Sequence, residues 1–274
     1  MSLGRRKVGL HEPARWVFNR MADVYGARPA YPAALIDALA ELATTVGGVV
    51  GDLGAGIGHL ALPLAARGFD VVAVEPAIAM LNRLGDTAAA QGVALRAVHA
   101  SAESLPLPRA SLGLAIISDA LHFMDAELVG GEIARVLTRG GALAIVTAEL
   151  TPTPFMQGVL RVIEGAVPRR PRDLTRALVH VSSVTRVPLT GEQRFFDETP
   201  VDRETLDGIL RSISFIGPAM HAARFAAFRA RIHALPDPPV WARTFVLRSG
   251  RRPLPALRPR KAKGEVEPGP STKV

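Results

Sequence analysis

The sequence contains no cysteine among its 274 residues. This absence excludes disulfides, thiolate metal sites and cysteine nucleophiles, and it agrees with a reducing compartment, so we expect a cytoplasmic protein. Lysine is missing between Lys7 and Lys261, which excludes a Schiff-base lysine from the body of the chain. Long hydrophobic runs are missing too. The longest stretch without Asp, Glu, Lys or Arg is the 14-residue segment 53–66, which is too short for a membrane-spanning helix. No apolar run follows the basic start, so no secretory signal is expected.

The strong positive charge is confined to the two ends of the chain. The net charge is +8 and the isoelectric point is near 10.8, values that suggest a nucleic-acid ligand. However, residues 1–7 carry a net +3 and residues 251–274 a net +5, whereas residues 8–250 hold 23 basic and 23 acidic residues. Terminal charge of this kind is typical of solvated tails. We therefore predict basic tails at 1–7 and 253–274, the latter disordered because it is rich in proline and charge, and expect no nucleic-acid partner.

The hydrophobic pattern predicts an α/β protein. Apolar strands with few charges alternate with amphipathic helices, as in a parallel sheet covered on both faces. Strands are predicted at 48–53, 70–76, 94–101, 111–121 and 142–150, and helices at 31–48, 58–68, 77–92 and 125–137. The pattern loosens after residue 150, where helices are predicted at 152–167, 201–214 and 217–235 and strands at 192–200 and 239–249.

A glycine turn follows the first predicted strand. Gly54, Gly56 and Gly58 give G-x-G-x-G, and His59 stands where the dinucleotide fingerprint G-x-G-x-x-G has its third glycine. Asp52 lies two residues before the turn, where it would repel a pyrophosphate and attract an ammonium group.

A second acid completes this pattern. Glu75 follows Gly54 by 21 residues at the end of the next strand, a spacing that suits a carboxylate accepting hydrogen bonds from ribose hydroxyls. One acid for an amino group and one for a ribose describe S-adenosylmethionine better than NAD. Glu75 as a mere helix cap remains the alternative.

Several segments together resemble the class I S-adenosylmethionine-dependent methyltransferases, in particular the type 11 group that acts on small molecules. "DLGAGIGHLALPLA" is similar to the first motif of that family, and "VVAVEPAIAML" to its second strand with the ribose acid. "HASAESLPLPRASLGLAII", "DALHFMD" and "FNRMADVYGARPAYP" resemble the adenine-contacting, acceptor-side and N-terminal segments. Gly113 stands where the family usually has an aspartate. The resemblance implies a Rossmann-like fold with a mainly parallel seven-stranded sheet, whose last strand is antiparallel, and a cap over the acceptor site.

The resemblance also implies the residues of the cofactor site. Asp52 and the glycine turn would face the methionine end of the cofactor, and Glu75 would bind its ribose. Met80, Ser101 and Ala102 would lie against the adenine. Tyr25, Arg28 and Tyr31 would cover the cofactor, and Arg28 is a candidate partner for its carboxylate. The implied set is Tyr25, Arg28, Tyr31, Asp52, Gly54, Ala55, Gly56, Glu75, Pro76, Met80, Ser101, Ala102, Glu103, Ser118 and Asp119.

His122 is the one candidate for catalysis. It follows the fourth strand, where the acceptor pocket of the family opens, and imidazole titrates near neutral pH, so His122 is predicted to be a general base; a purely structural role is the alternative. No group of His, Asp and Glu has metal-ligand spacing, and no metal is expected.

These observations predict one domain over residues 8–252, with 151–235 as the cap. We expect transfer of a methyl group from S-adenosylmethionine to an O or N of a small molecule, a secondary metabolite, with S-adenosylhomocysteine as the product. The protein is expected to be a monomer or a homodimer and to have no membrane partner. Three alternatives stay open: an RNA-directed methyltransferase, which would need a basic face; an NAD(P)-dependent oxidoreductase, which would need the third glycine; and a non-catalytic cofactor-binding module.

Overall fold

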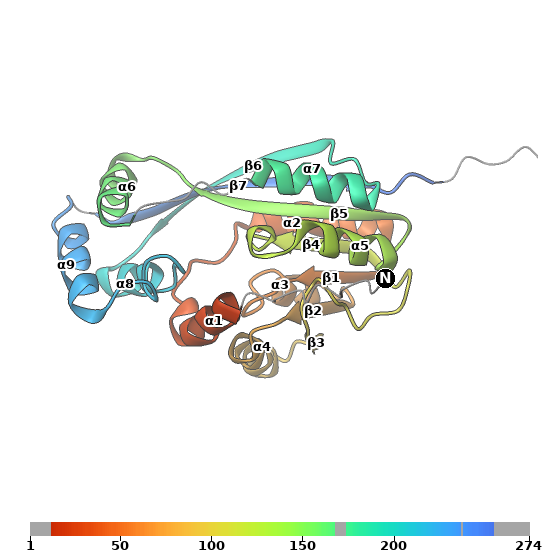
Figure 1. The fold of residues 1–274 in the computed structure, drawn as a ribbon, viewed down its shortest axis with the longest axis horizontal. Coiled ribbons are helices and arrows are strands. Elements are labelled where there is room, and N and C mark those ends of the chain that lie inside the picture. The colour runs from red at the N-terminus through yellow and green to blue at the C-terminus, as the bar shows by residue number, and fades with distance from the viewer. Residues whose placement is uncertain (1–11, 168–173, 237, 255–274) are drawn as a thin grey trace, which may run out of the picture.

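The computed structural model describes residues 12–167, 174–236 and 238–254. The predicted tail at 1–7 lies outside these ranges, and so does the predicted tail at 253–274 except for residues 253 and 254. A seven-stranded sheet in the order β3-β2-β1-β4-β5-β7-β6 runs through the molecule (Figure 1). Strands β1 to β5 are parallel, β7 is antiparallel to β5, and β6 is antiparallel to β7. The prediction of a mainly parallel sheet with an antiparallel last strand is therefore confirmed. The strands are Val49–Leu53 (β1), Val71–Glu75 (β2), Arg96–His99 (β3), Leu112–Ser118 (β4), Leu137–Leu150 (β5), Gly191–Pro200 (β6) and Val240–Arg251 (β7).

Helices cover both faces of the parallel part of the sheet. Helices α2 to α4 contribute to the core on one face, and α5 and α7 contribute to the core on the other. The central strands are apolar on both sides for this reason; in β4, every residue from Leu112 to Ile117 is buried. The helices are Glu12–Tyr25 (α1), Ala33–Val46 (α2), Ala61–Ala66 (α3), Ile78–Gln91 (α4), the short 3-10 helix Leu121–Phe123 (η1), Ala126–Val136 (α5), Pro154–Ala166 (α6), Leu174–Thr185 (α7), Arg203–Arg211 (α8) and Ala222–His233 (α9).

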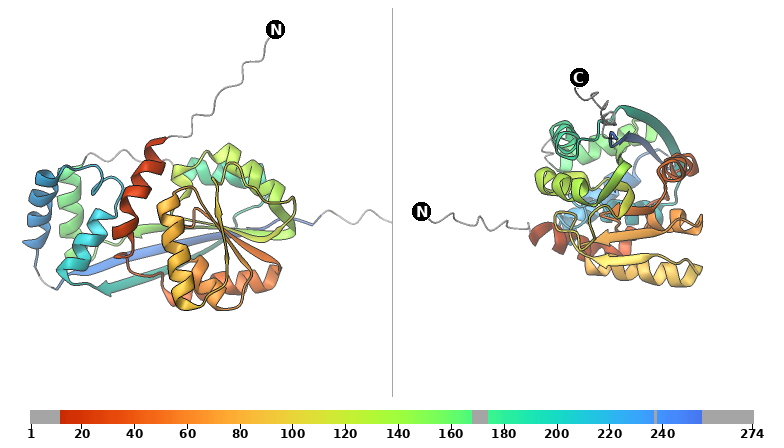
Figure 2. Two further views of the ribbon diagram at one scale, coloured as in Figure 1. Left: turned by 90° about the horizontal axis from the view of Figure 1, so that it is seen from below. Right: turned by 90° about the vertical axis from the view of Figure 1, so that its right-hand side faces the viewer.

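A separate lobe lies at one end of the molecule. Helices α6, α8 and α9 gather there, and the long strands β5, β6 and β7 reach it from the sheet (Figure 1). The lobe has its own hydrophobic core, which includes Met156, Leu210, Phe228 and Trp241. Helix α1 lies between α4 and α8 and joins the lobe to the main unit (Figure 2).

The segment predicted to form the cap, 151–235, is divided between the lobe and the main sheet. Helices α6, α8 and α9 form the lobe, whereas α7 packs against α5 on the sheet and β6 is the edge strand beside β7. A role as a cap therefore remains a proposal for the lobe helices alone. The sequence pattern predicted neither α1 nor α7. In α7, Val179 is exposed, which weakens the periodic apolar stripe that marks an amphipathic helix.

The structure explains why residue 113, at the start of β4, is a glycine. A Cβ atom built at Gly113 would lie 1.7 Å from the carbonyl oxygen of Gly47 and 2.9 Å from its carbonyl carbon. The strand register shifts at this point on both sides of β4. The turn after α2 thus crosses directly over residue 113 and excludes any side chain, including the aspartate common in the resembled family.

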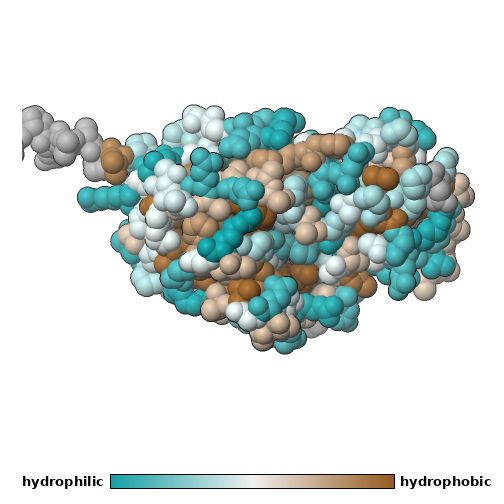
Figure 3. All heavy atoms as spheres, turned by 180° about the vertical axis from the view of Figure 1, so that it is seen from behind, coloured by the Kyte–Doolittle hydropathy of each residue, from teal (hydrophilic) through white to brown (hydrophobic). Residues whose placement is uncertain are grey.

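Within the described ranges, no helix is long and apolar enough to cross a bilayer. On the face drawn in Figure 3, hydrophobic residues are interspersed with hydrophilic ones.

Candidate functional site

The glycine turn lies at the carboxyl end of β1. Gly54, Gly56 and Gly58 have φ angles of 82°, 57° and 91°, in the left-handed region where only glycine is unstrained. The backbone N–H of Gly54 and that of Ala55 both donate to the carbonyl oxygen of Val74, at 2.8 and 3.1 Å. The end of β2 therefore holds the turn in place.

Side chains close in around the turn. A Cβ atom at Gly54 would lie 2.9 Å from the Cβ of Ala120 and 3.0 Å from the Cε of Met124, and one at Gly56 would lie 3.9 Å from the Cε1 of Tyr25. The turn backbone thus forms the floor of a narrow space between the segment after β4 and helix α1. A ligand can approach that floor closely only because the turn has no side chains there.

Glu75 lies beside this floor. Its carboxylate accepts the N–H of Gly56 at 2.9 Å and the N–H of Ala77 at 2.8 Å, one on each oxygen. Each carboxylate oxygen has two lone pairs, so one on each oxygen stays available for a further donor. Burial raises the pKa of Glu75, while the two backbone donors oppose that shift.

Asp52 lies deeper, with 2% of its surface exposed. Burial, with the nearby charge of Glu75, raises its pKa to about 7, and a hydrogen bond from the backbone N–H of Ala61 opposes the rise. The protein holds two carboxyl groups close together in a poorly solvated place without a cation, which costs free energy. A positively charged group bound there would relieve that cost.

The segment 25–31, here named the arm, leads from α1 toward α2 and crosses the same end of the sheet. The hydroxyl of Tyr31 is 2.8 Å from the Oγ of Ser118, and the guanidinium of Arg28 lies 4.3 Å above the ring of Tyr25. The nearby charge of Asp119 helps to raise the pKa of both tyrosines, although burial is the larger cause. The structure therefore brings the two tyrosines, Ser118 and Asp119 together; their role in binding a cofactor stays a prediction.

Arg28 has protein partners. Its Nε and Nη2 donate to the Oγ and the carbonyl oxygen of Ser212, at 2.8 and 2.7 Å, and its Nη1 donates to the Tyr25 hydroxyl at 3.1 Å. These bonds use three of its five N–H donors. Arg28 thus ties the arm to the end of α8, a role that the sequence did not indicate because Ser212 lies 184 residues away.

His59, which follows the glycine turn, lies beside the two tyrosines of the arm. Its ring centroid lies 6.0 Å from that of Tyr25 and 6.1 Å from that of Tyr31. Burial, with the charges of Arg28 and Arg243, lowers the pKa of His59 to about 4. The imidazole is therefore neutral at pH 7. The sequence pattern did not indicate this cluster, because His59 follows the glycine turn and the two tyrosines belong to the arm.

The residues expected near the adenine lie in and after β2 and β3. Met80 and Ala102 are buried in two different hydrophobic clusters, and the carbonyl oxygen of Pro76 is 3.1 Å from the Nε2 of His99. Glu103 accepts the backbone N–H of Asp125 at 3.1 Å. Ser101 lies two residues after the end of β3 and is partly buried.

Asp119 and His122 follow β4. Asp119 has a φ of 45°, an uncommon conformation for a residue other than glycine, and its N–H donates to the carbonyl oxygen of Val146. His122 lies in η1, partly buried, with its ring 4.0 Å from that of Phe123. Among the described residues, no group of three or more His, Asp or Glu side chains could hold a metal ion.

Comparison with known proteins agrees with this geometry. Residues 51–145 match the family described as "Methyltransferase domain". An uncharacterised methyltransferase of Mycobacterium tuberculosis is 42% identical over 119 residues, 43% of this chain and 46% of that protein. The chain thus matches about half the length of this curated relative.

Two solved structures share the fold. A putative type II methyltransferase from Anaeromyxobacter dehalogenans is 24% identical, with a TM-score of 0.55 over 83% of this chain and 99% of that one. The geranyl diphosphate C-methyltransferase from Streptomyces coelicolor, solved with S-adenosyl-L-homocysteine, is 13% identical, with a TM-score of 0.50 over 91% of this chain and 100% of that one. By its matched residues and its sheet, the chain carries a methyltransferase domain of the class I, S-adenosylmethionine-dependent kind.

Proposed function

We propose that the protein transfers a methyl group from S-adenosylmethionine to an oxygen or nitrogen atom of a small molecule, a secondary metabolite. The observation that carries the proposal is the carboxylate of Glu75. Two backbone N–H groups hold it beside the glycine turn, one on each oxygen. In this orientation, it presents two acceptor sites to a pair of neighbouring hydroxyls, which is the hydrogen-bonding pattern of a ribose.

The chemistry of the other groups fits the remaining parts of the cofactor. Asp52 supplies a carboxyl group for the ammonium, directly or through water. Tyr25 lies above Gly56, and Met80 and Ala102 supply an apolar wall for the adenine. Asp52 beside the turn disfavours a pyrophosphate, whereas a ribose acid at the position of Glu75 suits either cofactor. Asp52 is therefore the residue that argues against NAD(P).

The proposed reaction is an in-line displacement. S-adenosylmethionine supplies an electrophilic methyl group on a sulfonium; a bond forms between that carbon and the acceptor atom as the carbon–sulfur bond breaks, and a neutral thioether leaves. The acceptor loses a proton when it is a hydroxyl or an ammonium. Most of the acceleration would come from alignment in a site shielded from water, for which the arm and the lobe helices α6, α8 and α9 are the proposed cover.

His122 is the proposed general base for such acceptors. It follows the carboxyl end of β4, the position at which open α/β sheets bind their ligands. Asp119, with its strained backbone, orients the same segment. A carboxylate acceptor would require no base.

The class of acceptor is tested with radiolabelled S-adenosylmethionine. The full chain is incubated with a bacterial extract, and the label is then counted separately in the low-molecular-weight, protein and RNA fractions. We expect the label in the low-molecular-weight fraction, with less from the Glu75→Gln variant and the same amount from Glu41→Gln, an exposed acid on α2. Label in RNA alone would replace the small-molecule proposal with the RNA-directed alternative, and the absence of transfer would favour a cofactor-binding module.

A further inference from the structure

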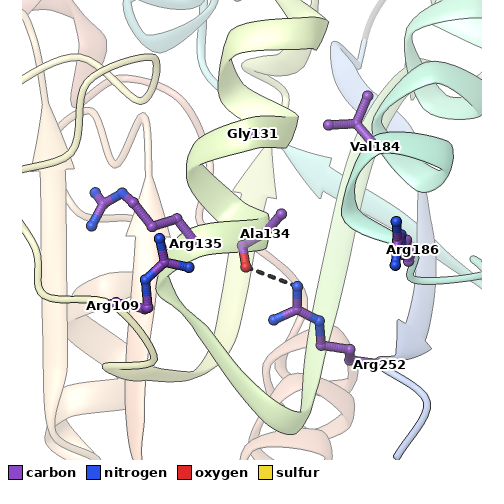
Figure 4. Close-up of a pocket in the computed structure, with 7 residues that line it drawn as sticks. All are labelled: Arg109, Gly131, Ala134, Arg135, Val184, Arg186 and Arg252. Carbon is purple, nitrogen blue, oxygen red and sulfur yellow. Dashed lines mark hydrogen bonds between the residues drawn. The ribbon is translucent and has the colours of Figure 1, made fainter. Parts of the chain in front are cut away.

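A second concave site lies at the opposite end of the sheet. A hollow of about 490 Å³ is lined by Arg109, Gly131, Ala134, Arg135, Val184, Arg186 and Arg252 (Figure 4). Arg109 precedes β4, Arg252 follows β7, and Arg135 lies in the last turn of α5. These positions belong to the amino end of β4, whereas the glycine turn lies at the carboxyl ends of the strands. We name this site the arginine hollow.

Two of its arginines are held rigidly. Arg135 donates to Glu132 through two nitrogens, at 2.8 and 2.7 Å, and also to the carbonyl oxygens of Leu105 and Leu107. Arg252 donates to the carbonyl oxygens of Ala134 and Leu137, at 2.8 and 2.9 Å (Figure 4). Glu132 balances the charge of Arg135, but the carbonyl partners of Arg252 are neutral. The charge of Arg252 therefore stays uncompensated.

The other two arginines are held less tightly. Within the ranges that the structure describes, the side chains of Arg109 and Arg186 form no hydrogen bond or ion pair, and both residues are exposed; the backbone N–H of Arg186 donates to the carbonyl oxygen of Ser183 at 3.2 Å. Arg186 also has a φ of 55°, a conformation that costs an arginine free energy. None of the described lining residues is acidic. Three positive charges thus converge without an acid of their own.

The floor of the hollow is made of small residues on one face of α5. A Cβ atom at Gly131 would meet nothing within 4 Å, so glycine is not required there by crowding. Glycine inside a helix is about 1 kcal/mol less favourable than alanine. With Ala134 one turn further along, Gly131 leaves room between the arginines.

We propose that the arginine hollow binds a phosphorylated small molecule through its phosphate groups. Guanidinium groups match phosphate oxygens in pairs, and three uncompensated charges suit an anion with several charges. The volume exceeds that of one phosphate and lies in the range of small-molecule pockets. Long nucleic acid is disfavoured, because residues 8–250 carry balanced charge. The competing account is that these arginines only balance the negative C-terminal end of α5.

Titration calorimetry at constant ionic strength tests the proposal, with inorganic tripolyphosphate and ATP as separate probes and the full chain as the sample. Equal affinities would mean that the phosphates alone are recognised, and tighter ATP binding would mean that the organic part is held too; both support the site. We expect the double variant Arg109→Gln/Arg186→Gln to bind at least tenfold more weakly. Gly131→Glu, which places a carboxylate in open space, should abolish binding.

The matched control is Arg161→Gln/Arg231→Gln, which removes two exposed arginines from the lobe and should bind like the wild type. Equal losses in both double variants, or no binding by the wild type, would overturn the proposal in favour of general charge or helix capping. The proposal would also be overturned by two results together. In the first, the protein binds single-stranded RNA tightly and loses that binding when residues 255–274 are deleted. In the second, Gly131→Glu changes the binding of neither phosphate probe. The circular dichroism spectrum and the urea unfolding curve of Gly131→Glu serve as the check on folding, so the outcome is independent of the proposed methyl transfer.

Discussion

The carboxyl end of the sheet holds buried acids, whereas the amino end holds exposed arginines. Asp52 and Glu75 lie beside the glycine turn, with 2% and 6% of their surfaces exposed, and backbone N–H groups are their partners. Arg109 and Arg186 lie at the far end, open to solvent. The body of the chain is neutral in total, so its balance of charge conceals this separation. Net charge alone therefore cannot locate a binding site, but the end of the sheet at which a charge lies can suggest its ligand.

The largest expected effect concerns catalysis at the carboxyl end. If His122 is the general base, His122→Ala should lower kcat by about 10²–10⁴-fold, the usual contribution of a general base, while the affinity for S-adenosylhomocysteine changes little. His180→Ala, a matched change of an exposed histidine on α7, should leave kcat unaltered. Steady-state kinetics with the identified acceptor provide the measurement. A loss of less than about tenfold would reduce His122 to a wall residue.

The next effect concerns the fold at the amino end, where β4 begins. Gly113→Ala should lower the free energy of unfolding by at least about 3 kcal/mol, since the new Cβ would collide with the backbone of Gly47. Gly131→Ala on α5, where the space is open, should instead raise it by about 0.5–1 kcal/mol. Urea unfolding followed by circular dichroism measures both. Similar values for the two variants would show that the crowding at Gly113 is relieved by a backbone shift.

The buried acid Asp52 makes stability depend on pH. Its pKa is raised to about 7 in the folded protein, from an ordinary value of 3.8, so the folded state binds more protons than the unfolded state between these pH values. Its contribution to stability therefore falls as the pH rises from about 4 to 7, by on the order of 4 kcal/mol, and then levels off. Asp52→Asn should lack this loss. Parallel curves of unfolding free energy against pH for the two proteins would contradict the account.

Glu75 should matter for cofactor affinity more than for folding. Glu75→Ala should weaken binding of S-adenosylhomocysteine by about 1–3 kcal/mol, the range for hydrogen bonds to charged groups. The exposed acid Glu41, changed to alanine, should have no such effect. Calorimetric titration compares the two variants. An unchanged affinity in Glu75→Ala would mean that the ribose is placed wrongly.

Much of the fold was predictable, because the parallel strands β1, β2 and β4 are buried apolar runs between turn residues and this pattern is local. The site at the carboxyl end was predictable in part for the same reason: Asp52, the glycine turn and Glu75 lie within one strand–turn–helix–strand unit. The bond between Arg28 and Ser212 and the contacts of His59 were not, because they join segments far apart in the chain. The arginine hollow was missed for the same cause. Its residues come from four separate parts of the sequence, and no local spacing links them.

The most direct test of the central claim is which nucleotide-containing ligand the carboxyl end accepts. Thermal unfolding of the full chain should be recorded with S-adenosylhomocysteine, NAD, NADP or FAD at equal concentrations. A ligand that binds only the folded state raises the melting temperature. The account predicts a rise with S-adenosylhomocysteine and none with the other three, and stabilisation by NAD alone would contradict it.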